Sequence, residues 1–304
     1  MIRDKAFREK LKSVISGKIL FDEPMDRHTS IGVGGRADVL IFPGSVNELS
    51  RAISYLRDCD VPFIPVGNCT NLIVREGGYS GVLVSLKELA AINYRPSSLS
   101  IDAEAGVLLS EIVNLSIMES LTGMEFCAGI PGSVGGGIKM NTGAFGSELK
   151  DVVETISLLN SGGKIKVTGK DEIKFEYRNL DLPEGAVIVG AKFLLAKGSK
   201  DEIRERVTEI LTTRKKKHPL EHRSAGSIFK NLTDISAGEI IDDIGLKGIQ
   251  IGGAMISEMH GNFIVNSGGA SAKDIIYLIN LAQEKVWKEK GIYLETEVKI
   301  IGED

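Results

Sequence analysis

Hydrophobic positions in the first 86 residues switch between helical and strand-like spacing. Residues 3–16 predict a short amphipathic helix, and residues 37–42 predict a strand. Ser45 is placed to cap a second helix, whose apolar positions recur at helical spacing: Val46, Leu49, Ile53 and Leu56. Runs at 61–66 and 81–86 predict two more strands. This part of the chain therefore predicts a small α/β unit.

The next part, residues 87–200, predicts a mixture with more strand than helix. A helix is expected at 110–121, and a glycine-rich stretch at 123–146 keeps neither period. The expected strands are residues 99–105, 152–159, 164–168 and 187–196. Ser161-Gly162-Gly163 is suited to the turn of a hairpin, so 152–159 and 164–168 are predicted to pair.

The remaining residues predict a connecting helix followed by a compact α+β region. The connector covers 201–217, and Pro219 ends it. The later elements are expected as helices at 236–244 and 271–290 and strands at 261–266 and 293–301. By the two-residue period of a strand, Glu295 and Glu297 would share one face.

Composition places the chain among globular proteins and narrows its partners. It has 304 residues, of which 42% are hydrophobic and 26% charged, with a net charge of −4 and pI ≈ 5.8. This acidic balance argues against a nucleic-acid or membrane-surface protein. The N-terminus is charged throughout, and no apolar run is long enough to span a membrane. We therefore expect a cytoplasmic protein. A monomer is the expected oligomeric state.

Cysteines and histidines predict neither a disulfide framework nor a metal site. The three cysteines are scattered without ligand spacing: Cys59, Cys69 and Cys127. His218 and His222 are four residues apart, but Pro219 interrupts the helix that would bring them together. Both are expected to be solvated loop histidines.

The glycine-rich stretch 123–146 is the strongest candidate for a binding site. Eight of its 24 residues are glycine, which favours sharp turns and close approach of the backbone to an anion. A tight turn between packed elements is the simpler alternative. Two more loops, 29–36 and 65–71, share this polar, glycine-containing character. Together they favour a large phosphorylated cofactor held by two α/β subdomains.

Common nucleotide motifs do not account for these loops. There is no P-loop sequence, and Gly32–Ala37 matches G-x-G-x-x-A but leads into a strand rather than a helix. From the residues alone, 224–231 is interpreted as a turn of small residues. The cation-rich run 214–223 fits either a solvated face or a site for a diphosphate.

Seven segments nevertheless occur in an order that identifies a family. They are HTSIGVGGRAD, PVGNCTNLIV, GIPGSVGGGIKMNTGAFG, FEYRNL, SAGSIFKN, HGNFIVN and ETEVKIIG, and they span residues 28 to 302. The chain resembles the UDP-N-acetylenolpyruvoylglucosamine reductases, flavoenzymes of peptidoglycan precursor synthesis and hence of cell-wall biogenesis, cell shape and cell division. The short span between Arg178 and Ser227 resembles the compact, type II form.

The resemblance implies an α+β fold with three domains. Two α/β subdomains would bind FAD in the manner of the vanillyl-alcohol-oxidase/PCMH flavoproteins: residues 1–86, joined by the strand at about 298–304, and residues 87–200. A C-terminal α+β domain, residues 201–297, would bind the UDP-sugar.

The resemblance also implies an activity. NADPH reduces FAD, and hydride from flavin N5 then adds to C3 of UDP-N-acetylglucosamine-enolpyruvate, giving UDP-N-acetylmuramate after protonation at C2. Ser227 matches the proton donor of the family. Arg178 and Glu297 match the residues that stabilise the intermediate. The expected partners are therefore this substrate and NADPH, with no nucleic acid and no membrane.

The binding residues implied by the resemblance fall in the same segments. Those expected to hold FAD are Thr29, Gly34, Gly67, Asn68, Thr70, Asn71, Leu72, Gly129, Ile130, Pro131, Gly132, Ser133, Gly135, Gly136, Asn141 and Gly143. Those expected to hold the substrate are Tyr177, Lys217, Arg223, Lys230, Asn231 and Asn262. No metal site is expected.

Two departures from the family pattern concern loops. Cys69 and Thr70 stand where the family has a glycine and a serine, and Leu232 replaces a proline. If Cys69 adopts a positive φ, the strain costs about 1 kcal/mol.

Two alternatives remain open. One is an FAD-dependent oxidase or dehydrogenase of the same fold that acts on an alcohol or sugar. The other is a non-catalytic nucleotide-sugar-binding protein without flavin.

Overall fold

A computed structural model describes residue 2 and residues 4–304 of the chain. The chain folds into two compact units, each assembled from separate segments. Unit 1 contains residues 1–21, 39–68 and 81–213, and unit 2 contains residues 22–38, 69–80 and 214–304. These limits do not coincide with the expected domain borders near 86, 200 and 297, so the division into three domains stays a prediction.

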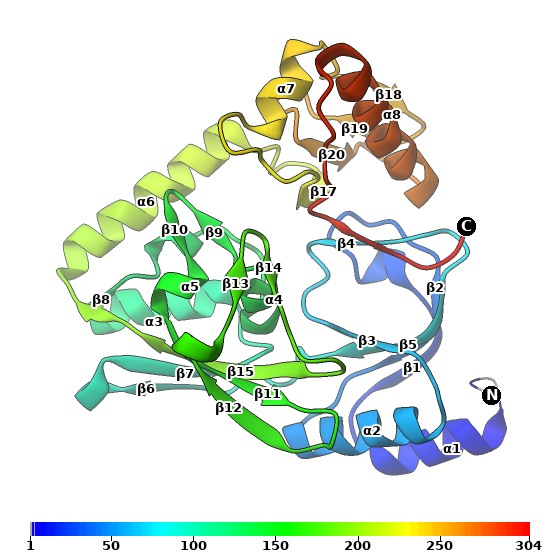
Figure 1. Cartoon of the computed structure of the whole chain (residues 1–304), viewed down its shortest axis with the longest axis vertical. Helices are drawn as coiled ribbons and strands as arrows, with labels where there is room; N and C mark the ends of the chain where they lie inside the picture. Colours follow the sequence, from blue (N-terminus) through cyan, green and yellow to red (C-terminus); the bar gives the residue numbers. More distant parts are fainter. Residues whose placement is uncertain (1, 3) are drawn as a thin grey trace. The chain divides into compact units, whose positions relative to one another are not determined.

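Unit 1 contains an antiparallel five-stranded sheet with the order β12-β11-β15-β7-β6 (Figure 1). Its strands are β12 (Ile165–Gly169), β11 (Val153–Leu159), β15 (Val187–Leu194), β7 (Ser100–Glu104) and β6 (Ile92–Arg95). The predicted hairpin is confirmed, since Ile156 pairs with Thr168 across β11 and β12. Because successive side chains of a strand point to opposite faces, β15 contributes to two cores: Ile188 to one, Val187 and Val189 to the other.

The first of these cores lies under helices α3 (Leu109–Glu119) and α4 (Val134–Lys139). Both helices lie on the same face of the five-stranded sheet in Figure 1. The helix predicted at 110–121 is confirmed as α3. The glycine-rich stretch, for which no regular element was expected, does form the short helix α4.

The second core lies beside helices α1 (Lys5–Val14) and α2 (Val46–Asp58), which run side by side in Figure 1. The helix predicted from residue 3 begins outside the described residues and is observed as α1. The predicted cap is confirmed, because the Ser45 hydroxyl accepts the backbone N–H of Glu48.

A four-stranded sheet, with order β1-β2-β5-β3, adjoins these two helices. Its strands are β1 (Ile19–Pro24), β2 (Arg36–Ile41), β5 (Tyr79–Ser85) and β3 (Phe63–Val66). β3 and β5 are parallel, with Phe63 opposite Val82. Three of the strands were predicted, and β1 was not.

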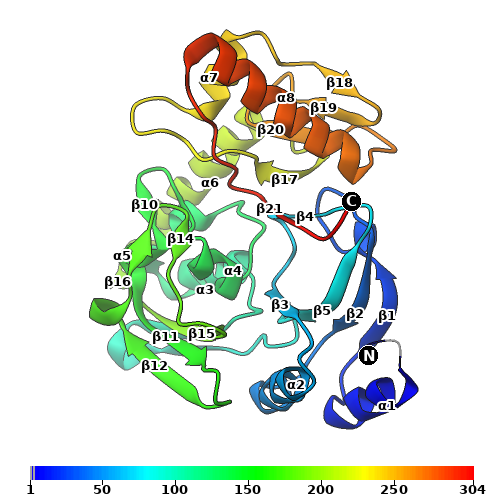
Figure 2. The ribbon, with the colours of Figure 1, turned by 45° about the vertical axis from the view of Figure 1, so that its right-hand side comes forward.

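Unit 2 has an antiparallel sheet with order β17-β20-β19-β18, and helices α7 and α8 lie along it (Figure 2). The strands are β17 (Arg223–Ser227), β20 (Phe263–Asn266), β19 (Ala254–Ile256) and β18 (Gln250–Ile251). The helices are α7 (Ala237–Asp243) and α8 (Ala272–Lys290), both predicted. Gly291, in left-handed conformation with φ 67°, ends α8.

The last strand is much shorter than predicted. Only β21 (Lys299–Ile301) is extended in a ladder, and it pairs in parallel with β4 (Leu72–Val74), a strand missed in the loop after β3. Residues 293–298 instead bond to residues 228–230: the Lys230 N–H donates to the Glu295 carbonyl and the Glu297 N–H to the Ile228 carbonyl. These two bonds flank an antiparallel bridge between Thr296 and Phe229, and the shared face of Glu295 and Glu297 stays a prediction.

The connector predicted at 201–217 is confirmed as the long helix α6 (Lys200–Lys217). The remaining elements of the described residues are short: η1 (Met25–Arg27), η2 (Pro96–Ser98), β8 (Leu121–Thr122), η3 (Glu125–Cys127), β9 (Gly143–Ala144), β10 (Ser147–Glu148), α5 (Leu149–Val152), η4 (Lys170–Glu172), β13 (Phe175–Glu176), β14 (Asn179–Leu180) and β16 (Ala196–Lys197). No helix within the described residues has the length and apolar character needed to cross a membrane.

Candidate functional site

Two predicted cofactor loops of unit 1 lie against each other. The Asn68 amide donates to the Pro131 carbonyl at 3.4 Å, which joins loop 67–68 to loop 129–133. A Cβ on Gly67 would stand 2.4 Å from the Ser133 hydroxyl, so any larger residue at position 67 would force that hydroxyl to move.

Ser133 gives this pair of loops the character of a binding site. Its side chain is 1% exposed, and its hydroxyl has no hydrogen-bond partner among the described residues. A buried hydroxyl left unpaired costs about 1–3 kcal/mol, so an acceptor on a bound group would relieve that cost. The backbone of Gly129, Pro131 and Gly136 is exposed beside it, and Ile130 and Gly132 are half-buried. These residues fit a phosphorylated cofactor such as FAD.

Gly135 is a packing residue and is not exposed to a ligand. It is buried in α4, and a Cβ there would lie 2.9 Å from the Cβ of Ala105. The absence of a side chain lets α4 sit on the end of β7. Gly135, predicted to contact the cofactor, thus positions the helix that follows the loop.

Arg178 lies at the tip of a very short hairpin in unit 1. Strands β13 and β14 are two residues each, with Glu176 opposite Asn179, so Tyr177 and Arg178 form the turn. Arg178 has φ 56°, a conformation that is uncommon for residues other than glycine. Its guanidinium donates to the Gly143 carbonyl at 3.1 Å and lies 5.1 Å from the centre of the Tyr177 ring.

Asn141, predicted to bind the cofactor, is fully buried and bonded within the protein. Its amide donates to the Glu148 carboxylate and, at 3.2 Å, to the Glu176 carbonyl, and its oxygen accepts the Lys150 N–H. These bonds connect the glycine-rich stretch to the hairpin that carries Arg178.

The predicted cofactor loops of unit 2 are also joined. The Ser30 N–H donates to the Cys69 carbonyl at 3.2 Å, and the Thr29 hydroxyl, 2% exposed, donates to the Val33 carbonyl. Cys69 has φ 51°, so the left-handed conformation anticipated for it is observed. Gly34 faces Val74 across this region.

The second of these loops holds the segment that carries Glu297. The Asn71 amide donates to the Glu297 carbonyl at 3.1 Å, and Leu72 pairs with Lys299 in the β4–β21 ladder. Thr70, beside them, is half-buried, as is Glu297 itself. Unit 2 therefore brings a predicted catalytic residue next to predicted cofactor residues.

Ser227 is the last residue of a strand, not part of the turn expected from its small neighbours. β17 pairs with β20, and its register shifts between Ser224 and Ser227, where Gly226 has φ 74°. This irregularity re-aims the end of the strand. The Ser227 hydroxyl is half-buried, and among the described residues none bonds to it.

The residues after Ser227 are fixed by Asn262. Its side-chain oxygen accepts the Phe229 N–H and its amide donates to the Phe229 carbonyl, both at 2.8 Å. Asn262 is only 2% exposed. In this structure the amide predicted to hold substrate is thus engaged with the backbone that follows Ser227.

Arg223 is bonded to a cofactor loop. Its guanidinium donates to the Thr29 carbonyl at 3.1 Å and to the Ser30 carbonyl at 3.3 Å, and it lies against Gly32. A substitution of Arg223 would therefore disturb that loop as well as any substrate contact.

The other predicted substrate residues are accessible to differing degrees. Lys217 and Asn231 are exposed, and the Asn231 oxygen accepts the Ala237 N–H at the start of α7. Half-buried Lys230 pairs with the Glu295 carboxylate at 2.6 Å. Tyr177 in unit 1 is 46% exposed.

His218, His260 and Phe263, the first residue of β20, form an aromatic cluster that no local sequence pattern predicts. The His218 ring lies 5.6 Å from that of His260 and 5.0 Å from Phe263. Burial, reinforced by Arg214 and His260, lowers the pKa of His218 to about 4, and burial also lowers the pKa of His260. The expectation of a solvated His218 is wrong, because a partner 42 positions later in the chain desolvates it.

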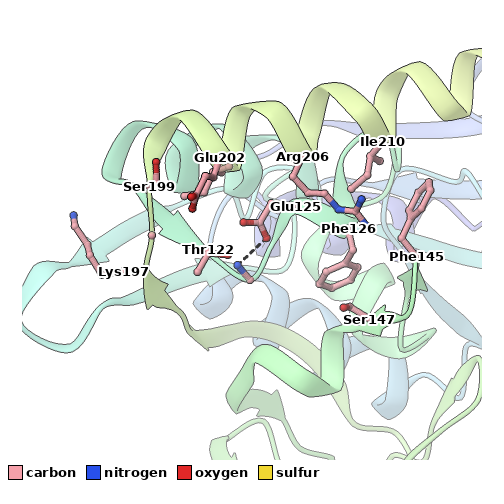
Figure 3. Close-up of a pocket in the computed structure, with 13 residues that line it drawn as sticks. Thr122, Glu125, Phe126, Phe145, Ser147, Lys197, Ser199, Glu202, Arg206 and Ile210 are labelled. Atoms are coloured by element: carbon pink, nitrogen blue, oxygen red, sulfur yellow. Dashed lines mark hydrogen bonds between the residues drawn. The ribbon is translucent and has the colours of Figure 1, made fainter.

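Unit 1 contains a pocket of about 600 Å³ (Figure 3). α6 supplies Glu202, Arg206 and Ile210 on one side, and Phe126 and Phe145 lie opposite. None of the predicted site residues lines it. The pocket therefore does not mark the candidate site, whose residues lie in loops and at the ends of strands and helices.

Two family models match the chain. A model of the UDP-N-acetylenolpyruvoylglucosamine reductase C-terminal domain matches residues 218–301, and a model of an FAD-binding domain matches residues 37–169. Together they cover loops 67–72 and 129–133 and the segment that contains Ser227 and Glu297, whereas loop 29–34 and Arg178 lie outside both matches. They support the α+β fold expected for the chain, with an FAD-binding part and a C-terminal part.

Similar proteins extend over nearly the whole chain. A UDP-N-acetylenolpyruvoylglucosamine reductase of Syntrophus aciditrophicus is 50% identical, covering 100% of this chain and 98% of the relative. One of Caldanaerobacter subterraneus is 45% identical, covering 97% and 98%. The crystal structure of the reductase from Thermus caldophilus superposes with a TM-score of 0.80 at 33% identity, covering 93% of this chain and 98% of that one.

Proposed function

Since the chain belongs to the UDP-N-acetylenolpyruvoylglucosamine reductase family, we propose that Arg178, Ser227 and Glu297 carry its reaction. The reaction reduces UDP-N-acetylglucosamine-enolpyruvate to UDP-N-acetylmuramate for peptidoglycan synthesis, with FAD as cofactor and NADPH as reductant. Identity of 50% over the entire chain is the observation that supports the activity.

The loops of both units are proposed to hold FAD, which when bound supplies the hydride that it receives from NADPH. In unit 1 the proposed residues are Gly67, Asn68 and the loop 129–133, where the unpaired Ser133 hydroxyl favours an anionic oxygen. In unit 2 they are loops 29–34 and 70–72.

Arg178 is proposed to bind the carboxylate of the enolpyruvyl group. Its guanidinium presents N–H donors in a planar fork that matches a carboxylate. Negative charge builds on this carboxylate when C3 receives hydride, so a fixed cation lowers the energy of that state most. Glu297 is proposed to stabilise the same intermediate.

Ser227 is proposed to donate the proton that C2 requires. A serine hydroxyl carries one O–H donor and is a weak acid, so its alignment matters more than its acidity. Its position at the half-buried end of β17 leaves it accessible to a bound substrate.

The UDP-sugar is proposed to be held by the remaining predicted residues: Tyr177, Lys217, Arg223, Lys230, Asn231 and Asn262. Lys217 is exposed, so its substitution tests whether the cation-rich run 214–223 binds the substrate without disturbing the fold. Reversing its charge should weaken substrate binding and leave FAD affinity unchanged. Equal substrate affinity would instead assign Lys217 to a solvated face.

We also propose that the protein acts in the cytoplasm, since substrate and reductant are both water-soluble nucleotides, and that it is a monomer. Sedimentation of the purified protein at several concentrations tests the monomer. The divisions 1–86, 87–200 and 201–297 are proposed as its domains.

The absorption spectrum of the purified protein tests the activity. NADPH should bleach the yellow protein, and UDP-N-acetylglucosamine-enolpyruvate should then restore the colour without oxygen. Bleaching by an alcohol or sugar donor alone would instead support an oxidase or dehydrogenase. A colourless protein that cannot be reconstituted with FAD would support a binding protein.

A further inference from the structure

The hairpin that presents Arg178 cannot hold itself in place. Each of its strands, β13 and β14, has two residues, and an isolated two-stranded hairpin is at best marginally stable in water. Arg178 in its turn also has a left-handed backbone, which persists only where surrounding contacts enforce it. Contacts from elsewhere in unit 1 must therefore fix the guanidinium.

Lys139, the last residue of α4, makes two such contacts. Its ammonium donates to the Leu180 carbonyl at 2.6 Å and to the Asn179 side-chain oxygen at 3.2 Å. Both acceptors belong to β14, immediately after Arg178. A lysine at a helix end commonly serves the carbonyls of its own helix, but here the ammonium reaches across to another element.

The next residues complete the hold on the hairpin. The Asn141 amide donates to the Glu176 carbonyl on β13, and the Gly143 carbonyl accepts from Arg178 itself. Lys139 thus bonds to the second strand of the hairpin, Asn141 to the first strand and Gly143 to the turn. Lys139 is the one of the three with a full charge, and charge-assisted hydrogen bonds are stronger than neutral ones.

The same short helix links this grip to the loop proposed to bind the cofactor. α4 begins directly after Ser133, whose hydroxyl is unpaired, and ends at Lys139. Gly135 lets α4 pack against the end of β7, and this packing fixes the positions of both ends of the helix.

We propose that Lys139 is a positioning residue for Arg178, holding the β13–β14 hairpin so that the guanidinium meets the substrate carboxylate. This inference rests on the proposed role of Arg178. It assigns to the glycine-rich segment a second task besides the cofactor: its C-terminal end orients a catalytic side chain.

Lys139→Met, which keeps the aliphatic stem and removes the ammonium, tests the inference. Reoxidation of reduced flavin by the enolpyruvyl substrate should slow by about 10- to 100-fold, because small misplacements of a reacting group have effects of this size. Flavin reduction by NADPH should not change. Amide hydrogen exchange in residues 175–180 should accelerate, with or without substrate.

Three further variants sharpen the result. Lys139→Arg retains donors and should restore most of the rate. Lys164→Met, at an exposed position of the same unit, should behave like the parent protein. In an Arg178→Ala background, Lys139→Met should have no further effect on reoxidation, because a residue that acts through Arg178 has nothing left to position.

The opposite outcomes are equally distinct. An unchanged reoxidation rate, or an equal loss in both half-reactions with normal exchange in 175–180, would overturn the inference. Full additivity with Arg178→Ala would do the same. If the parent protein's flavin is not reoxidised by the substrate, the proposed function fails, while hydrogen exchange still decides whether Lys139 holds the hairpin.

Discussion

Arg178 and Ser227 are presented in opposite ways, one in each unit. Arg178 lies in the turn of a minimal hairpin, with a strained backbone and with polar contacts from one neighbouring segment. Ser227 ends a strand of a four-stranded sheet, and the buried amide of Asn262 secures the residues after it.

The difference follows from what each side chain has to do. A guanidinium is long and must be aimed, so a projecting turn gripped by polar side chains suits it. A serine hydroxyl reaches barely beyond the backbone, so the backbone itself must be placed, and a buried double hydrogen bond does this. We therefore expect substitutions of the residues that hold Arg178 to slow the reaction. Substitutions of the residues that hold Ser227 should instead lower the stability of the fold.

The largest effect is expected for Ser227→Ala. Loss of a positioned proton donor should slow reoxidation of reduced flavin by the enolpyruvyl substrate by about 10²- to 10⁴-fold. Reduction by NADPH should proceed normally, since the hydroxyl has no part in it. Rapid-mixing spectroscopy separates the two steps, and an equal loss in both would show that Ser227 is structural.

Asn262→Ala should be the most destabilising change among the supports. It leaves the N–H and C=O of buried Phe229 unpaired, which should cost about 3 kcal/mol in the free energy of unfolding. Asn280→Ala, on the exposed side of α8, is the matched control and should differ little from the parent. Urea titration measures both, and equal midpoints would contradict the role assigned to Asn262.

Unit 2 should also respond to pH through His218. Because its pKa in the folded protein is lowered to about 4 from a usual value near 6.5, the unfolded state binds more protons between these values. Stability is therefore greatest above pH 6.5 and falls as the pH drops toward 4. Arg214, Lys217 and His260 all disfavour a charged His218.

Urea titrations from pH 4.5 to 7.5 measure this dependence. His218→Gln should flatten it, whereas the exposed control His222→Gln should leave it as steep as in the parent protein. If the urea midpoint of the parent protein does not decrease as the pH is lowered, the desolvation of His218 is contradicted. The pKa of His260, which burial also lowers, contributes to the slope that remains in His218→Gln.

The smallest effect is expected at Cys69, which shares its left-handed backbone with Arg178. Cys69→Gly should be more stable than Cys69→Ala by about 1 kcal/mol, because glycine adopts this conformation without strain. Thermal unfolding compares the two variants. If alanine proves as stable as glycine, the loop does not impose a positive φ in solution.

The same two regions show what the sequence could and could not predict. Helices such as α2 and α8 were predicted from their periodicity and caps, because these signals are local. The seven ordered segments located Arg178, Ser227 and Glu297. Their supports escaped prediction, because Lys139 and Asn262 act on residues 33 to 41 positions away.

Two errors have the same cause. Small residues around Ser227 favour a turn, but pairing with Phe263 makes the segment a strand. The alternating pattern of 293–301 favours a single strand, but only residues 299–301 form a ladder, while Thr296 makes a single antiparallel bridge with Phe229. In each case a distant partner overrode a correct local preference.

The composition of unit 2 has a consequence for how the protein is made. It combines residues 22–38 and 69–80 with 214–304, and β4 from its early part pairs with β21 near the end of the chain. During synthesis, unit 1 can close once residue 213 has left the ribosome. The early loops of unit 2 must wait, with β4 unpaired, until the last strand emerges. The interval between these two events is when the nascent chain is most open to wrong pairing and most in need of chaperones.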